Sequence, residues 1–100
     1  MTFSQKVYKV VSKIPAGKVM TYKQVAEKAG SPRAYRAVGT LMKNNPDKKS
    51  IPCHRVVCSD GSMGGYAFGG EDAKKKSLVS EGIEFKGNRV LASQIYNFML

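Results

Sequence analysis

Residues 21–44, TYKQVAEKAGSPRAYRAVGTLMKN, carry the signals for two short helices and the turn between them. Thr21 is a suitable N-cap for a helix over residues 22–29, and Gly30 would end it. Ser31 and Pro32 predict a second start, with Ser31 as N-cap and Pro32 at the first position of a helix that reaches about residue 44. Two short helices joined by a tight Gly-Ser turn predict a helix-turn-helix.

The second of these helices has an apolar face and a polar face. The apolar residues fall within about 100° on a wheel of 3.6 residues per turn. They are Ala34, Val38, Leu41 and Met42. The opposite side carries Arg33, Arg36, Thr40 and Lys43, flanked by the small residues Ala37 and Gly39. A solvated charged stripe is the ordinary explanation of such a face. Its position after a helix-turn-helix turn favours contact with DNA instead.

Charge supports a polyanionic partner. The net charge is +10 over 100 residues, and residues 1–49 hold eleven Lys and Arg residues against only Glu27 and Asp47. A one-sided basic distribution favours nucleic acid, although charge alone favours a lysine-rich solvated surface equally. No apolar run has the length of a membrane span or the form of a signal peptide. Two cysteines without such a signal predict free thiols in a reducing cytoplasm.

The remaining pattern predicts one domain over residues 1–100, mainly α with a short β-hairpin and winged-helix-like. Apolar spacing predicts a first helix over residues 3–14, broken at residues 15–17. Residues 55–58 predict a short strand, followed by a turn at residues 59–62. The glycines of residues 64–70 predict a loop that can lie close to a planar ligand. A last helix is predicted over residues 71–81, stopped by Gly82, while the tail from Phe85 gives no clear prediction.

The heptapeptide IPCHRVV, residues 51–57, places Cys53 beside His54, the protein's only histidine. A thiol becomes a good nucleophile when it loses its proton, and an imidazole within hydrogen-bond reach can remove that proton. On an extended segment adjacent side chains point to opposite faces, so the pair alone is weak evidence. A reactive cysteine together with a basic helix-turn-helix is rare, and the combination leaves far fewer possible functions than the Cys-His pair alone.

These residues resemble a known family, the O-6-alkylguanine-DNA alkyltransferases, also called methylated-DNA–protein-cysteine methyltransferases. The resemblance covers residues 3–84, and its most specific motif is PCHRV at residues 52–56. Supporting matches are Thr21-Tyr22, Arg36-Ala37-Val38-Gly39, Asn45-Pro46, Gly65-Tyr66, and Leu78 through Glu81-Gly82. The resemblance implies DNA repair in a single turnover, in which an alkyl group moves from the guanine oxygen to Cys53.

The resemblance also implies roles for the other active-site residues. His54 would act as the base, through a water, and Glu81 would orient His54. Tyr22 would lie at the flipped nucleotide and protonate the departing guanine. Asn45 would brace the turn that carries Cys53. Without the family, Tyr22 would be a core residue, Asn45 a loop residue and Glu81 a surface residue that opposes its helix dipole.

The expected DNA-binding residues lie around the helix-turn-helix, which this family uses in the minor groove. Arg36 would enter the duplex and fill the space of the extruded base, because the damaged oxygen lies inside the base stack. The other expected DNA contacts are Thr21, Arg33, Ala37, Thr40 and Lys43. The expected substrate pocket consists of Gly64, Gly65, Tyr66 and Ala67, and Ala67 and Phe68 differ from common family residues there.

Two alternatives to alkyl transfer bear on this prediction. The length of the chain resembles the alkyltransferase-like proteins, which bind alkylated guanine without repairing it and pass it to nucleotide excision repair. Those proteins typically carry Trp or Ala where this chain has Cys53, so the thiol favours alkyl transfer over lesion binding alone. A helix-turn-helix regulator is a third possibility. Cys58 is expected to be a buried structural thiol, and three ligands at unusual spacing make zinc improbable. We expect no cofactor, no metal and a cytoplasmic monomer acting on double-stranded DNA.

Overall fold

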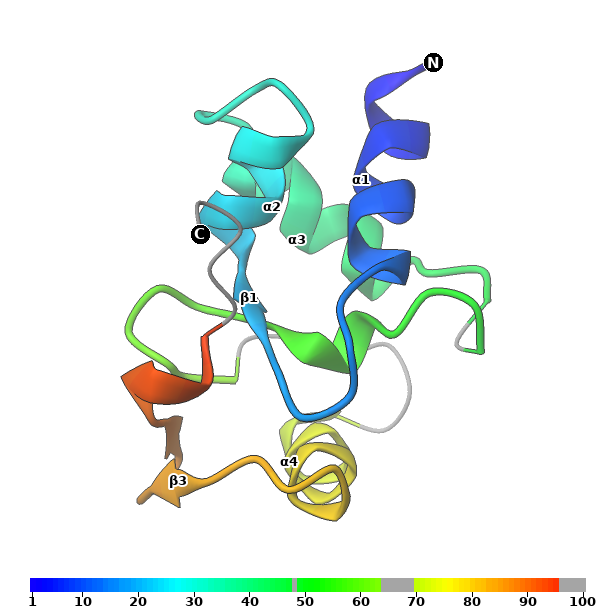
Figure 1. Cartoon of the computed structure of the whole chain (residues 1–100). Coiled ribbons are helices and arrows are strands. Elements are labelled where there is room, and N and C mark those ends of the chain that lie inside the picture. Colours follow the sequence, from blue (N-terminus) through cyan, green and yellow to red (C-terminus); the bar gives the residue numbers. More distant parts are fainter. Residues whose placement is uncertain (48, 64–69, 96–100) are drawn as a thin grey trace.

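The computed structural model describes residues 1–47, 49–63 and 70–95 and is mainly helical, as predicted (Figure 1). In chain order the α-helices are α1 (Phe3–Ser12), α2 (Tyr22–Lys28), α3 (Tyr35–Lys43) and α4 (Gly70–Ser80). The strands are β1 (Met20–Thr21), β2 (Val56–Val57), β3 (Phe85–Lys86) and β4 (Arg89–Val90). Two 3-10 turns, η1 (Cys53–Arg55) and η2 (Ala92–Gln94), complete the described elements. No helix in these ranges is both long and apolar enough to cross a membrane.

The predicted helix-turn-helix is formed by α2 and α3. Thr21 caps α2 as expected, and its hydroxyl accepts a hydrogen bond from the backbone of Gln24 at 3.0 Å. The start of α3 differs from the prediction, because Ser31 does not cap it and the helix begins only at Tyr35. Residues 32–34 instead form a turn, closed by a 2.9 Å hydrogen bond from the Ala34 N–H to the Ser31 carbonyl. Ser31 and Pro32 therefore belong to the turn that joins α2 to α3, and not to the start of α3.

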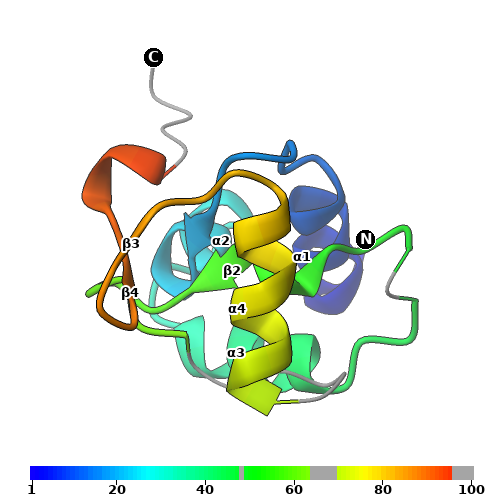
Figure 2. The same cartoon turned by 90° about the horizontal axis from the view of Figure 1, so that it is seen from below.

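The paired strands β1 and β2 separate two apolar clusters. They run parallel, with Met20 opposite Val56 and Thr21 opposite Val57. Because successive strand residues point to opposite faces, Met20 and Val56 pack among α1, α2 and α3, whereas Val19 and Val57 pack with Leu78 of α4. Figures 1 and 2 show this layering, with α4 on one side of the strands and the three other helices on the opposite side.

The predicted β-hairpin exists, but it is formed by other residues. We expected a strand over residues 55–58, but Arg55 belongs to η1 and the strand is limited to Val56–Val57. The antiparallel hairpin is β3–β4, in the tail from Phe85 for which no clear prediction was possible. Gly61 packs against it with φ +87°, and a Cβ there would lie 2.6 Å from the Val90 carbonyl oxygen. Only glycine fits this close approach.

The ends of the outer helices also differ slightly from the prediction. The first helix ends at Ser12 rather than residue 14, although Ile14 remains buried beyond its end. The last helix spans residues 70–80, so Glu81 follows the helix instead of lying in its last turn. Gly82, with φ +86°, reverses the chain there and permits the turn toward β3.

Candidate active site

The 3-10 turn η1 carries the Cys-His pair at the point where the helical layer meets β2. Cys53 is 1% exposed and packs in the cluster of α1, α2 and α3. The expectation of an extended segment was wrong here. A 3-10 helix has about three residues per turn, so consecutive side chains point roughly 120° apart. Cys53, His54 and Arg55 can therefore reach three different surroundings from one short turn.

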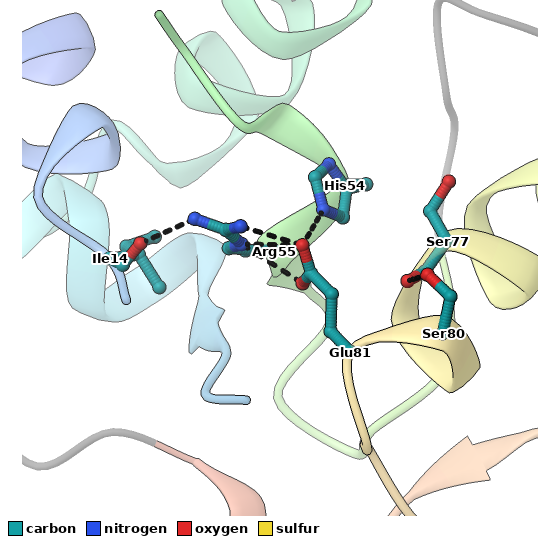
Figure 3. A network of polar contacts seen from close by, with 6 residues as sticks. All are labelled: Ile14, His54, Arg55, Ser77, Ser80 and Glu81. Carbon is teal, nitrogen blue, oxygen red and sulfur yellow. Dashed lines mark hydrogen bonds and ion pairs between the residues drawn. The ribbon is translucent and has the colours of Figure 1, made fainter. Parts of the chain in front are cut away.

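His54 is held by Glu81, a residue 27 positions later that follows the end of α4. Nε2 of His54 lies 3.0 Å from Oε2 of Glu81, and His54 is buried (Figure 3). An ionised carboxylate can only accept, so Nε2 carries the proton of the neutral ring and Nδ1 is then the basic nitrogen. This tautomer follows from the hydrogen-bond network. The structure therefore brings together His54 and Glu81 as the resemblance implied.

Arg55 binds the same carboxylate from another side (Figure 3). Its Nε donates to Oε1 of Glu81 at 3.0 Å and its Nη2 donates to Oε2 at 2.6 Å. Its Nη1 donates to the Ile14 carbonyl at 2.8 Å, beyond the end of α1. Burial raises the pKa of Glu81, but hydrogen bonds from Arg55 and His54 outweigh it and hold that pKa below its usual value.

Asn45 braces the approach to η1. Its side chain is buried, its Nδ2 donates to the Ile51 carbonyl at 2.7 Å, and its Oδ1 accepts from the Asp47 N–H at 2.9 Å. The Cys53 N–H donates to the same Ile51 carbonyl at 2.8 Å. One carbonyl thus joins the Asn45 amide to the backbone of the cysteine, which fixes the loop where it enters the turn.

Tyr22, the first residue of α2, meets a buried lysine from α4. Nζ of Lys74 donates to Oη of Tyr22 at 3.2 Å and to the Met63 carbonyl, and Lys74 is 0% exposed. Burial, with the thiols of Cys58 and Cys53 adding to it, raises the pKa of Tyr22 to about 12. Burial lowers the pKa of Lys74 to about 8, against opposing effects that include both thiols. Tyr22 is therefore a protonated phenol at neutral pH.

The exposed face of α3 adjoins Tyr22. A surface hollow of about 390 Å³ is lined by Tyr22, Tyr35, Arg36, Gly39, Thr40 and Lys43. Arg33 lies at a second hollow formed with the turn before α3, and Ala37 is exposed. Thr21, expected to contact DNA, is instead only 7% exposed and uses its hydroxyl to cap α2. Arg36 and Lys43 thus line the same hollow as the Tyr22 phenol.

The structure corrects the expectation for Cys58. Because η1 is a 3-10 turn, the alternation that would have buried Cys58 does not extend from Cys53. Cys58 is half-buried and lines a hollow of about 230 Å³ with Tyr22, Lys23, Tyr35 and Ser59. Gly64, Gly65, Tyr66 and Ala67, the expected substrate pocket, lie outside the described residues.

The sequence interpretation missed two residues of the site, Lys74 and Arg55. For Lys74 a signal existed, because it precedes the buried Leu78 by four residues and a helix places such residues on one face. It was hidden by the run of three lysines at residues 74–76. For Arg55 there was no local signal, since both partners are distant in sequence.

Comparison with known proteins identifies the family. Residues 2–83 match the family described as 6-O-methylguanine DNA methyltransferase, DNA binding domain. The chain therefore belongs to this family of DNA alkyltransferases, as the sequence motifs predicted.

Individual relatives agree with this assignment. A methylated-DNA–protein-cysteine methyltransferase of Cricetulus griseus is 47% identical over 79 residues, which are 79% of this chain and 38% of that protein. One from Methanosarcina barkeri is 51% identical, covering 67% of this chain and 42% of that protein. The chain spans less than half the length of these curated relatives.

Two solved structures have a similar fold. S. pombe Atl1, in complex with damaged DNA containing O6-carboxymethylguanine, superposes with a TM-score of 0.81 at 33% identity. That match covers 95% of this chain and 94% of Atl1. Mycobacterium tuberculosis OGT in complex with DNA gives a TM-score of 0.77 at 38% identity, over 82% of this chain and 49% of that one. Both matches confirm the helix-turn-helix alkyltransferase fold.

Proposed function

We propose that this protein repairs O6-alkylguanine in duplex DNA by moving the alkyl group to Cys53 in a single turnover. The observation that carries the proposal is the contact of Glu81 with His54, which lies on the same turn as Cys53. Family membership and the activity named for the relatives support it. Neither a metal nor a cofactor takes part in the proposed step.

The proposed chemistry is a displacement at carbon. His54 accepts the Cys53 proton, through a water, and the thiolate attacks the alkyl carbon. The S–C bond forms as the C–O6 bond breaks, and the electron pair of that bond stays on the guanine. Tyr22 donates a proton to a ring nitrogen of the guanine, and the ammonium of Lys74 stabilises the phenolate oxygen that results. The thioether product is inert, so each molecule acts once.

The face of α3 is proposed to hold the duplex. Arg36 lies beside Tyr22 in the hollow of α3 and is suited to occupy the space that the extruded base leaves. Arg33 and Lys43 are exposed on the same helix-turn-helix and would neutralise phosphates. We further infer that the protein is cytoplasmic and acts on DNA as a monomer. Sedimentation with and without an oligonucleotide would check the monomeric state.

Mass spectrometry tests the central proposal. After incubation with a duplex carrying O6-methylguanine, the intact protein should gain the mass of one methyl group. Peptide mapping should place it on Cys53 and leave Cys58 unmodified, so the second thiol serves as an internal control. Recovery of unmodified protein that nevertheless binds the lesion tightly would reject alkyl transfer.

That outcome would favour the alternative, a lesion-binding protein that does not repair. The specific observation in its favour is the superposition on S. pombe Atl1, which was solved in complex with damaged DNA and gives a TM-score of 0.81. In that case the lesion would pass to nucleotide excision repair, and binding of excision-repair proteins to the protein–DNA complex would be the measurement. Cys53 beside His54 and Glu81 favours the catalytic proposal.

A further inference from the structure

The Glu81 carboxylate lies in a place that is electrostatically unfavourable for an anion. It follows the last residue of α4, where the carbonyl ends of the helix carry partial negative charge. The Glu81 N–H donates to the Leu78 carbonyl at 3.0 Å, which keeps the residue against this end. The side chain is only 17% exposed, so water can compensate little of the charge. A cation fixed beside the carboxylate favours its ionised form here.

Arg55 supplies that cation in a geometry that also fixes direction. Nε donates to Oε1 of Glu81 and Nη2 donates to Oε2, as a side-on pair. Nε also donates to Oε2, at 3.2 Å. Two parallel N–H···O bonds between planar groups leave a carboxylate one orientation. The remaining arm, Nη1, donates to the Ile14 carbonyl, so the guanidinium is anchored to the segment after α1.

We propose that Arg55 is a positioning residue that selects the tautomer of His54. It holds Glu81 ionised and turned toward Nε2, so that the ring proton stays on Nε2 and Nδ1 stays available as the base. This inference deepens the proposed function and rests on it for its biological meaning. Oε2 accepts from both Nε2 of His54 and Nη2 of Arg55, so one carboxylate oxygen joins the two side chains.

Other titratable groups near the site do not replace this link. Lys74 of α4 and Tyr22 of α2 interact electrostatically with Cys53 and Cys58. Among the described residues, the charges that act on Glu81 are those of His54 and Arg55. Loss of the Arg55 charge would leave the carboxylate opposed only by the imidazole. Protonated His54 would then be favoured to higher pH, and an unclamped carboxylate could turn away from Nε2.

Nuclear magnetic resonance can test this directly, because His54 is the only histidine and its ring nitrogens give unambiguous ¹⁵N signals. The native protein should show the neutral ring protonated at Nε2. In Arg55→Gln the population of the other tautomer should rise several-fold and the titration midpoint should move to higher pH. Arg55→Lys keeps the charge but not the side-on pair. Its His54 titration midpoint should therefore stay near that of the native protein, while its population of the other tautomer should still rise.

The matched control is Arg89→Gln. Arg89 also pairs with a carboxylate, Asp60, but at 3.8 Å and with both side chains exposed. This variant loses the same charge and should leave the His54 spectrum unchanged. If folded Arg55→Gln gives the same spectrum and titration as Arg89→Gln, the proposal is overturned. If circular dichroism shows that Arg55→Gln does not fold, the tautomer population of Arg55→Lys decides in the same way.

A second measurement separates this proposal from the proposed function. Alkylation of Cys53 by iodoacetamide, followed against pH with Cys58 as internal reference, requires no DNA. Arg55→Gln should shift the rise of Cys53 reactivity to higher pH, and Arg89→Gln should not. Native protein that takes no methyl group from DNA but shows these shifts would reject alkyl transfer alone. Native protein that takes the methyl group while Arg55→Gln shows no shift would reject the role of Arg55 alone.

Discussion

The turn η1 and the exposed face of α3 are built in opposite ways. In η1 the functional side chains are buried or half-buried, and those of His54 and Arg55 bind partners far away in sequence, Glu81 and Ile14. On α3 both Arg36 and Lys43 are exposed, and no described carboxylate forms an ion pair with either of them. The difference indicates that the chemistry depends on fixed geometry, whereas the face of α3 depends on available charge.

The largest expected effect comes from removing the thiol. Cys53→Ala should abolish methyl transfer, because no other described group on η1 can accept the alkyl carbon, while binding to a duplex with O6-methylguanine should persist. Transfer is read by mass spectrometry and binding by fluorescence anisotropy. Cys58→Ala is the control and should retain both. Simultaneous loss of transfer and binding in Cys53→Ala would show that the two regions are not separable.

Arg36→Ala is expected to separate recognition of the lesion from general binding to duplex DNA. Without a side chain to occupy the gap, base extrusion should become harder by a few kcal/mol, which corresponds to roughly a 10- to 100-fold loss of transfer rate or lesion preference. Affinity for undamaged duplex should fall only slightly, since one of many positive charges is lost. Arg33→Ala is the matched control on the same helix-turn-helix. If Arg36→Ala lowers the affinity for lesion-containing duplex and for undamaged duplex by the same factor, Arg36 is only a phosphate contact.

The buried Lys74 and the half-buried Tyr22 of the site can be tested by measuring the free energy of unfolding as a function of pH. The pKa of Lys74 is lowered on folding, so the unfolded chain binds more protons between about pH 8 and 10.5, and stability rises with pH in that window. Tyr22 has the opposite sign, because its raised pKa removes stability above about pH 10. Between pH 8 and 9.5 the native protein should therefore gain about 1–2 kcal/mol relative to Lys74→Met. Urea denaturation at several pH values measures this difference.

A flat difference between native protein and Lys74→Met over that range would mean that Lys74 stays protonated in the folded protein as it does in the unfolded chain. A surface substitution, Lys76→Met, is the control and should not alter the pH dependence, since Lys76 is exposed.

The smallest effect is expected from single charges on the exposed face. Affinity for undamaged duplex should fall with salt, with a slope of log K against log salt of roughly −3 to −6. Lys43→Ala should make this slope shallower by about 0.9, the value for one phosphate contact on B-DNA. Cys53→Ala should not change it. A slope near zero for the native protein would remove phosphate neutralisation from the account of binding.

Local sequence signals determined much of this protein. Capping and glycine signals located α2 and the turn, the apolar spacing of α3 separated its buried Val38 and Met42 from its charged face, and PCHRV identified the family. These succeed because helix caps, helical periodicity and a contiguous motif are written within a few residues of one another. The resemblance also pointed to Glu81, which spacing alone would have left as a surface residue.

Only the tertiary structure decided what joins distant segments. The 3-10 conformation of η1, the parallel pairing of β1 with β2, and the hairpin β3–β4 depend on packing between segments that local propensity does not relate. The same holds for burial of Lys74 and for the bonds from Arg55 to Glu81 and Ile14. A buried charge is tolerable only where its partners converge on it, and that convergence exists only once the chain has folded.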